Sequence, residues 1–325
     1  MGRLVFCWMA LIVLPLWQVS PARAENLTLA VSRGPVSLAV YVAESEGYFS
    51  REGVRVQTRD CARGRSCLNL LRDGSAQLAT AAELIVTLNS FRHPDLVIIA
   101  TVSTSSHPVK LVARRSAGIA SPVDLADKRV GTVVDTSAQY FLDSWLLFYG
   151  IDPRRVTIVP LEADQLAGAL QRQELDAIAI WEPLAGFALA GLGEDGLVLP
   201  NPRVYTQHFN LLTTRQTVAS HRADLEKVLR ALLSAQNLIA QEPGKAQRIL
   251  RARLGIEPAV ADMSLKEHDF RIRLDQTLLT TMGTQARWAV REGYVAPGNN
   301  LNVPLHAVES DLLRRLAPDA VTLAP

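Results

Sequence analysis

The turn at Thr136 and Ser137 has the residue types and the setting of a ligand-binding helix start. A short apolar run at residues 130–134 precedes it, and apolar side chains follow at spacings of three and four within residues 138–149. This order predicts a strand, a turn and a helix capped by Thr136 or Ser137. The unpaired N–H groups of such a helix start bind small anions or polar ligands. The alternative is an ordinary helix cap that holds no ligand.

A second candidate is Trp181-Glu182-Pro183, which follows a short buried strand predicted at residues 177–180. In open α/β sheets, ligands lie at the carboxyl ends of the strands. Trp181 would therefore form a wall of a cleft, and Glu182 would bind a donor group or hold a hinge. Buried packing is the alternative for Trp181, and an ion pair between two lobes is the alternative for Glu182.

Catalytic and metal-binding motifs are absent from the sequence. It contains no GxSxG or HExxH pattern, Gly34-Pro35 is not a phosphate loop, and the six histidines stand singly. Asp176 and Glu182 also lack the sequence relation of an acid–base pair. We therefore expect a protein that is not an enzyme and that needs no cofactor or metal.

The first 24 residues have the form of a cleaved secretory signal. Arg3 precedes an apolar run at residues 4–17, and Ala22-Arg23-Ala24 matches a cleavage site before Glu25. An uncleaved anchor is the alternative, although the run is shorter than the roughly 18 residues of a spanning helix. No later stretch of the sequence is long and apolar enough to span a membrane, so we expect a soluble periplasmic protein.

Cleavage would leave a chain of balanced charge. Residues 1–24 contain Arg3, Arg23 and no acidic residue, so 32 basic and 32 acidic residues remain. This balance gives no indication of nucleic-acid binding. The remaining length is the size at which chains divide into lobes, and we expect two.

The two cysteines outside that segment, Cys61 and Cys67, enclose Ala-Arg-Gly-Arg-Ser. In an exported protein this spacing favours a disulfide. Chain entropy gives so short a loop only about 2.4 kcal/mol of stabilisation, so the bond would shape a local loop more than it holds the fold. Metal ligation is the alternative, but neither a CxxC motif nor clustered histidines accompany the pair.

Two successive βαβ series are needed to position these residues. In the first, strands and helices alternate, and we predict them at residues 27–31, 37–49, 54–58, 66–72 and 76–79. The second series follows with the same alternation, at residues 130–134, 138–149, 156–159, 163–172 and 177–180. Residues 70–80 and 169–179 form a weak internal repeat. Each series implies a mainly parallel sheet with helices on its faces.

Two segments are interpreted as crossings between the lobes. Apolar runs flank the polar residues 103–108, from which Ser105 and Ser106 would reach a cleft. A solvated loop is the alternative for this segment. Residues 209–213 form the return crossing, and the apolar stripes that follow predict packed helices joined by an extended link at residues 298–304.

Four stretches of the sequence, in this order, resemble the periplasmic substrate-binding proteins of nitrate, sulfonate, taurine and thiamine-precursor ABC importers. They are AVYVAESEGYFSREGVRV at residues 39–56, DLADKRVGT at 124–132, LDAIAIWEP at 175–183 and EPGKA at 242–246. The resemblance implies an α/β type II periplasmic-binding-protein fold, in which two lobes with mixed, mainly parallel sheets are joined by two crossing segments. It implies lobe 1 at residues 25–106, lobe 2 at 107–208, and the completion of lobe 1 with C-terminal helices at 209–325.

The same resemblance implies a monomeric solute-binding protein that delivers a small ligand to the permease and ATPase of an ABC importer. The ligand groups carried over by position are Gly34, Pro35, Ser37, Ala81, Ala82, Thr136, Ser137 and Trp181. Gln77 and Gln173 stand where the family commonly has Asp and Gly, and the cysteine pair is not a general family feature. These departures leave open a ligand different from those of the best-known family members. We favour a sulfonate or a nitrate-like anion over a neutral pyrimidine.

Two other functions stay open at this point. A periplasmic ligand-sensing or accessory binding protein would use the same fold and the same binding physics. An enzyme similar to the pyrimidine synthases of this group is the other, although those enzymes resemble intracellular proteins rich in Cys and His. Importer genes beside this one would favour transport, and a lone sensor kinase would favour sensing.

Overall fold

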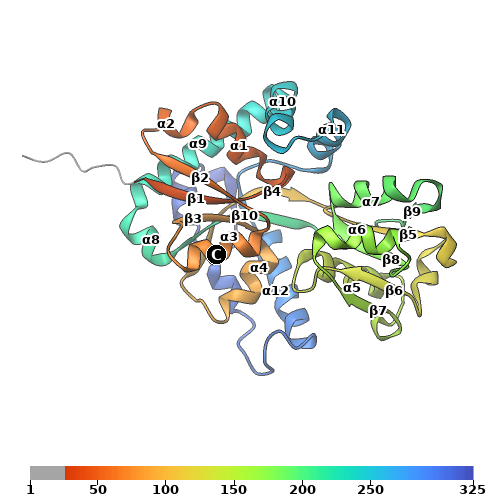
Figure 1. Cartoon of the computed structure of the whole chain (residues 1–325). Helices are drawn as coiled ribbons and strands as arrows, with labels where there is room; N and C mark the ends of the chain where they lie inside the picture. Colours follow the sequence, from red (N-terminus) through yellow and green to blue (C-terminus); the bar gives the residue numbers. More distant parts are fainter. Residues whose placement is uncertain (1–25, 325) are drawn as a thin grey trace, which may run out of the picture.

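The computed structural model describes residues 26–324. The expected secretory signal therefore lies outside the described residues. Figure 1 shows two lobes lying beside each other, with β4 and β10 extending from one lobe toward the other. Between residues 26 and 324, no helix has both the length and the apolar character needed to cross a membrane.

Lobe 1 is built on a five-stranded sheet with the strand order β2-β1-β3-β10-β4. Its strands are β1 (Leu27–Ser32), β2 (Val56–Cys61), β3 (Leu78–Ala82), β4 (Leu96–Ser105) and β10 (Gln207–Thr214). β1 pairs parallel with β2 and β3, and β10 pairs antiparallel with β3 and β4. The predicted strands at residues 54–58 and 76–79 are thus real, but both begin two residues later than expected.

Lobe 2 repeats this plan with the strand order β7-β6-β8-β5-β9. Its strands are β5 (Val109–Arg114), β6 (Arg129–Thr132), β7 (Thr157–Pro160), β8 (Ala177–Trp181) and β9 (Gly196–Val198). β6 pairs parallel with β7 and β8, whereas β5 pairs antiparallel with β8 and β9. Two mixed sheets joined in this way confirm the predicted fold class.

The chain crosses between the sheets after β4 and again before β10. Ser103, Thr104 and Ser105 are buried and belong to the end of β4, where they pair with β10. The alternative of a solvated loop at residues 103–108 is therefore wrong, because only residues 106–108 connect β4 to β5. Polar residues fill this strand end because it lies between the lobes rather than within one apolar core.

Helices cover both faces of each sheet. In lobe 1 they are α1 (Leu38–Ser45), α2 (Tyr48–Arg51), α3 (Gly64–Arg72) and α4 (Glu83–Ser90). In lobe 2 they are α5 (Ser137–Phe148), α6 (Ala163–Gln171) and α7 (Leu184–Leu192). The helix predicted from residue 37 ends near Gly47, as its glycine indicates, because the left-handed φ of 68° at Gly47 separates α1 from the short α2.

The C-terminal part adds a helical layer to lobe 1. It comprises α8 (Arg215–Ser220), α9 (Arg222–Gln241), α10 (Pro243–Leu254), α11 (Pro258–Glu267), α12 (Gln276–Arg291), α13 (Asp311–Leu316) and a small sheet of β11 (Leu274–Asp275) and β12 (Val321–Thr322). The apolar stripe of α9 is buried in the lobe 1 core, as predicted. The link at residues 298–304 is formed by turns and the start of a 3-10 helix instead of extended chain.

α12 packs on both lobes. Its N-terminal half contributes Leu278 and Met282 to the lobe 1 core, whereas Trp288 and Ala289 belong to an apolar cluster that is otherwise mainly lobe 2. The Trp288 indole N–H donates to Asp143 Oδ2 of α5 over 2.8 Å. In Figure 1, α12 accordingly lies beside α4, on the side of lobe 1 that faces lobe 2.

Candidate ligand-binding cleft

A cavity of about 400 Å³ lies between the lobes and is lined by residues from both of them. It lies at the carboxyl ends of β1, β3, β6 and β8, where the chain leaves each strand for a helix. This is the edge at which parallel α/β sheets bind ligands. The volume falls in the range typical of small-molecule sites.

Five helices present their first residues to this cavity. From lobe 1 these are Gly64 of α3 and Ala82, the cap of α4; from lobe 2 they are Ser137 of α5, Ala163 of α6 and Leu184 of α7. Each helix start has N–H groups without a partner inside the helix and carries a partial positive charge. Their convergence makes the cavity suited to a ligand that carries an oxyanion.

The predicted cap at Thr136 is confirmed. Thr136 Oγ1 accepts a hydrogen bond from the N–H of Ala138 over 3.2 Å and donates to Val133 O over 2.6 Å. Ser137 Oγ accepts from the Gln207 side chain of β10 over 2.8 Å, so it joins the two lobes. Because both hydroxyls already have partners, this turn would offer a ligand chiefly its backbone N–H groups.

Trp181 and Glu182 both line the cavity from lobe 2. Trp181 is half-buried and packs against both apolar clusters of that lobe, so it is a wall residue and a packing residue at once. Glu182 Oε2 accepts from the N–H of Gly186 over 3.0 Å and so holds the first turn of α7. Burial raises the pKa of the Glu182 carboxyl.

Of the expected lobe 1 residues, Gly34, Pro35 and Ala82 line the cavity. The expected residues that do not line the cavity make structural contacts instead, and these are Ser37, Ala81, Ser105 and Ser106. Ser37 Oγ donates to Ser32 O, while Ser105 and Ser106 hold the backbone and ring of His107. Ala81 packs against Gly64, where a Cβ would lie 2.9 Å from that of Ala81, so this contact requires glycine.

Several cavity residues had no sequence motif to mark them. Gln207 and Phe209 come from β10, Phe187 comes from α7, and Arg63 and Arg65 come from the loop between Cys61 and Cys67. The Ala-Arg-Gly-Arg-Ser sequence of that loop was a visible signal, because two arginines between cysteines are an unusual charge density.

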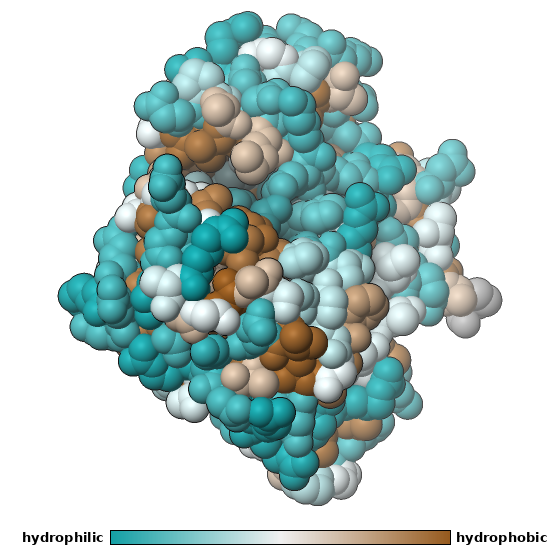
Figure 2. All heavy atoms as spheres, turned by 90° about the vertical axis from the view of Figure 1, so that its right-hand side faces the viewer, coloured by the Kyte–Doolittle hydropathy of each residue, from teal (hydrophilic) through white to brown (hydrophobic). Residues whose placement is uncertain are grey.

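Apolar side chains form much of the remaining wall. They are Val36, Ile85, Phe187, Phe209, Leu254 and Ile256. Phe187 is 55% exposed. Figure 2 shows hydrophobic patches on the lobe 2 side within an otherwise mainly hydrophilic surface. The cavity therefore combines polar helix starts with apolar contact area for the body of a ligand.

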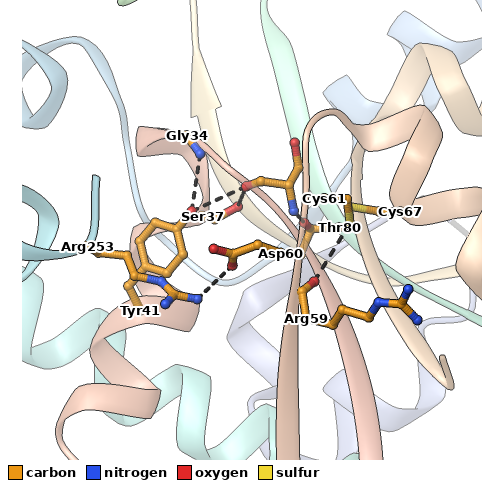
Figure 3. Close-up of a disulfide and its surroundings, with 10 residues drawn as sticks. Gly34, Ser37, Tyr41, Arg59, Asp60, Cys61, Cys67, Thr80 and Arg253 are labelled. Carbon is orange, nitrogen blue, oxygen red and sulfur yellow. Dashed lines mark hydrogen bonds and ion pairs between the residues drawn. A yellow bond between two sulfur atoms is a disulfide. The ribbon is translucent and has the colours of Figure 1, made fainter. Parts of the chain in front are cut away.

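Cys61 and Cys67 form a disulfide with a Cα–Cα distance of 5.5 Å, as predicted. The bond joins the end of β2 to α3 (Figure 3). Within residues 26–324, His, Cys, Asp and Glu form no group of three or more that could hold a metal ion.

Two α/β lobes with a cleft between them at their strand ends are the arrangement of the type II periplasmic-binding-protein fold, and solved structures share this fold. The alkanesulfonate-binding protein SsuA from Xanthomonas axonopodis pv. citri, bound to MOPS, superposes with a TM-score of 0.75 at 17% identity, covering 90% of this chain and 100% of that one. SsuA from Escherichia coli gives 0.76 at 18%, with 88% and 92% covered. The nitrate-binding protein NrtA from Synechocystis PCC 6803 gives 0.72 at 13%, with 90% and 88% covered.

The chain belongs to the NMT1/THI5-like family, whose model matches residues 34–246. It is also 28% identical over 181 residues to the taurine-binding periplasmic protein of Escherichia coli K12. That match covers 55% of this chain and 53% of the relative, so it spans about half the length of either protein.

Proposed function

We propose that this protein is a periplasmic solute-binding protein that passes a small organic oxyanion, a sulfonate in particular, to the permease and ATPase of an ABC importer. The observation that carries the proposal is the convergence of helix starts from two lobes on one cavity. Backbone N–H groups and helix dipoles bind an anion without a buried counter-charge, which favours reversible binding and release.

The apolar wall decides between small and larger anions. A nitrate ion would occupy a small part of a cavity of about 400 Å³ and would leave the aromatic side chains without a partner. An organic body attached to the oxyanion would bury against Trp181, Phe187 and Phe209 and gain about 25 cal/mol for each Å² of apolar area removed from water. This size argument supports a sulfonate with an organic body.

Binding without chemistry is favoured by the partners of the reactive side chains. Cys61 and Cys67 are bonded to each other and offer no thiolate nucleophile. The two histidines at the cavity are engaged as well, since His107 contacts Ser106 and Arg203, and His268 Nδ1 contacts Ser264 O. The fold also occurs in DszB, whose complex with biphenyl-2-sulfinic acid superposes with a TM-score of 0.67, so turnover needs a direct test.

Native mass spectrometry of the exported protein, followed by calorimetric titration of ligand-free protein, tests the proposal. We expect saturable binding of MOPS or taurine, weaker binding of nitrate, and none of uracil as a neutral pyrimidine. The bound compound should be recovered unchanged. Binding of uracil alone, or recovery of a converted product, would overturn the proposal.

A further inference from the structure

The disulfide loop of lobe 1 makes two ion pairs with lobe 2 across the cavity. Arg63 Nη2 lies 2.5 Å from Glu162 Oε2, and Arg65 Nη2 lies 3.1 Å from Asp135 Oδ2. Arg65 also donates to the backbone carbonyl of Asp135 over 3.3 Å. Both arginines stand between Cys61 and Cys67, so a single short loop supplies both contacts.

The base of this loop is fixed on lobe 1. The carbonyl of Cys61 accepts a hydrogen bond from the N–H of Arg33 over 3.0 Å. Its neighbour Asp60 pairs with Arg253 of α10 over 2.6 Å, and Figure 3 shows this pair beside the disulfide. With both ends of the loop held, the arginine side chains start from a defined backbone position and face lobe 2.

Arg63 occupies a position that is unfavourable for a cation. It is the cap residue of α3, where its side chain makes no capping hydrogen bond and its charge adds to the positive end of the helix. Cap positions favour Ser, Thr, Asp and Asn, which accept N–H groups. An arginine here is explained by its contact with Glu162, and the covalent bond to Cys67 supplies the local order that a cap would otherwise give.

We propose that the loop from Cys61 to Cys67 is a disulfide-ordered clasp, in which Arg63 and Arg65 bind Glu162 and Asp135 and hold the lobes closed over the cavity. The proposal rests on the proposed binding function, since a clasp matters to a cleft that opens and closes. Arg63 and Arg65 are positioning residues in this role, because they act on the ligand through the acidic residues of lobe 2.

A competing explanation is that the two arginines bind the anionic ligand directly. Both line the cavity, so position alone does not separate the two roles. Removing the lobe 2 acids does separate them. If the arginines bind the ligand, Asp135→Asn/Glu162→Gln frees two cations and tightens anion binding. If they form a clasp, the same double variant weakens binding.

The expected effects are modest because all four side chains are partly exposed. Exposed ion pairs contribute little individually, so we expect each pair to change the dissociation constant by about threefold and both together by about tenfold. Salt screens such pairs, so the difference between wild type and variant should shrink at high ionic strength.

The test measures lobe closure by small-angle X-ray scattering without ligand, and affinity by calorimetry with MOPS. Asp135→Asn/Glu162→Gln and Cys61→Ser/Cys67→Ser should both give a larger radius of gyration and weaker MOPS binding than wild type. Arg63→Glu alone should do the same, and Arg63→Glu/Glu162→Arg should restore part of the loss. Glu174→Gln, which removes an exposed ion pair with Arg172 within lobe 2, is the matched control.

Scattering needs no ligand, so the clasp and the proposed function fail separately. If wild-type protein does not bind MOPS, the ligand class is wrong while the scattering comparison still decides the clasp. Identical scattering of wild type and the two double variants would overturn the clasp. Tighter MOPS binding by Asp135→Asn/Glu162→Gln would also overturn it and assign the arginines to the ligand.

Discussion

The two lobes share one arrangement of strands and helices, but equivalent positions make the same kind of contact with different side chains. Gln77, directly before β3, accepts a hydrogen bond from the N–H of Thr28 over 2.9 Å, and its counterpart Asp176, directly before β8, accepts one from the N–H of Arg129 over 2.8 Å. Both bonds tie adjacent strands at the end away from the cavity. Gln77 is therefore a structural variation, and its departure from the family pattern carries no information about the ligand.

The starts of α3 and α6 differ in a more consequential way. α6 has a capping box, in which the side chains of Glu162 and Gln165 each accept a hydrogen bond from the other residue's backbone N–H. The equivalent residue of α3 is Arg63, which caps nothing, and a disulfide orders the turn instead. Glu162 therefore caps its own helix and also meets Arg63 across the cleft, whereas Arg63 caps nothing and serves only the contact across the cleft.

The largest expected difference between the lobes concerns Asp176 and Gln77. Asp176 also pairs with Arg114, which is 5% exposed, so Asp176→Ala leaves a buried guanidinium without its counter-charge. We expect a loss of about 3 kcal/mol in unfolding free energy. Gln77→Ala removes one neutral hydrogen bond and should cost about 1 kcal/mol. Chemical denaturation of both variants measures the difference, and equal losses would refute the distinction.

The pH dependence sharpens this prediction. Although burial opposes it, hydrogen bonds from Arg129 lower the pKa of Asp176 below its ordinary value. A lowered folded-state pKa contributes stability above the unfolded pKa and loses it as the pH falls through the folded value. The gap between wild type and Asp176→Ala should therefore narrow below about pH 4, while the Gln77→Ala gap should stay constant.

The two helix starts give the next prediction. Cys61→Ser/Cys67→Ser removes the constraint on α3 and should lower the unfolding free energy by about 2.4 kcal/mol. Glu162→Ala removes the capping box of α6 and should cost about 1 kcal/mol. Thermal unfolding of the two variants tests this order. A larger loss for Glu162→Ala would show that the disulfide does not replace a cap.

Within the cleft, the wall should matter more than the turn. Trp181→Ala removes apolar contact area and should weaken binding by about 2 kcal/mol or more. Thr136→Ala removes the cap that orders this turn and its ligand-facing N–H groups, and so should weaken binding by about 1 kcal/mol. Calorimetry with the co-purified ligand compares them, with the surface aromatic variant Phe148→Ala as control. Unchanged affinity in both folded variants would show that the site lies elsewhere.

The smallest expected effect compares the turns that precede β3 and β8. Gly74 and Gln173 occupy equivalent positions with φ of 79° and 63°. In this left-handed region the backbone of a residue other than glycine is strained. Gln173→Gly should therefore raise stability by up to about 1 kcal/mol, and Gly74→Gln should lower it by a similar amount. Denaturation midpoints decide this, and a loss in Gln173→Gly would show that the glutamine side chain compensates for its backbone.

Local patterns in the sequence determined the elements and several of their contacts. The strand-turn-helix at residues 130–149, its cap at Thr136 and the disulfide follow from residues close together in the chain. Alternating strands and helices also implied two parallel series before any contact was known. These features depend on hydrogen bonds and apolar periodicity within a few turns of the backbone.

Tertiary structure alone decided which residues of the two lobes and of α12 meet one another. Gln207 meets Ser137, Arg63 meets Glu162, and Trp288 meets Asp143, although the members of each pair are far apart in sequence. The pairing depends on strand register, on the rotation of one lobe against the other and on the path of α12. No local pattern records those three quantities, because each is set by the packing of whole elements.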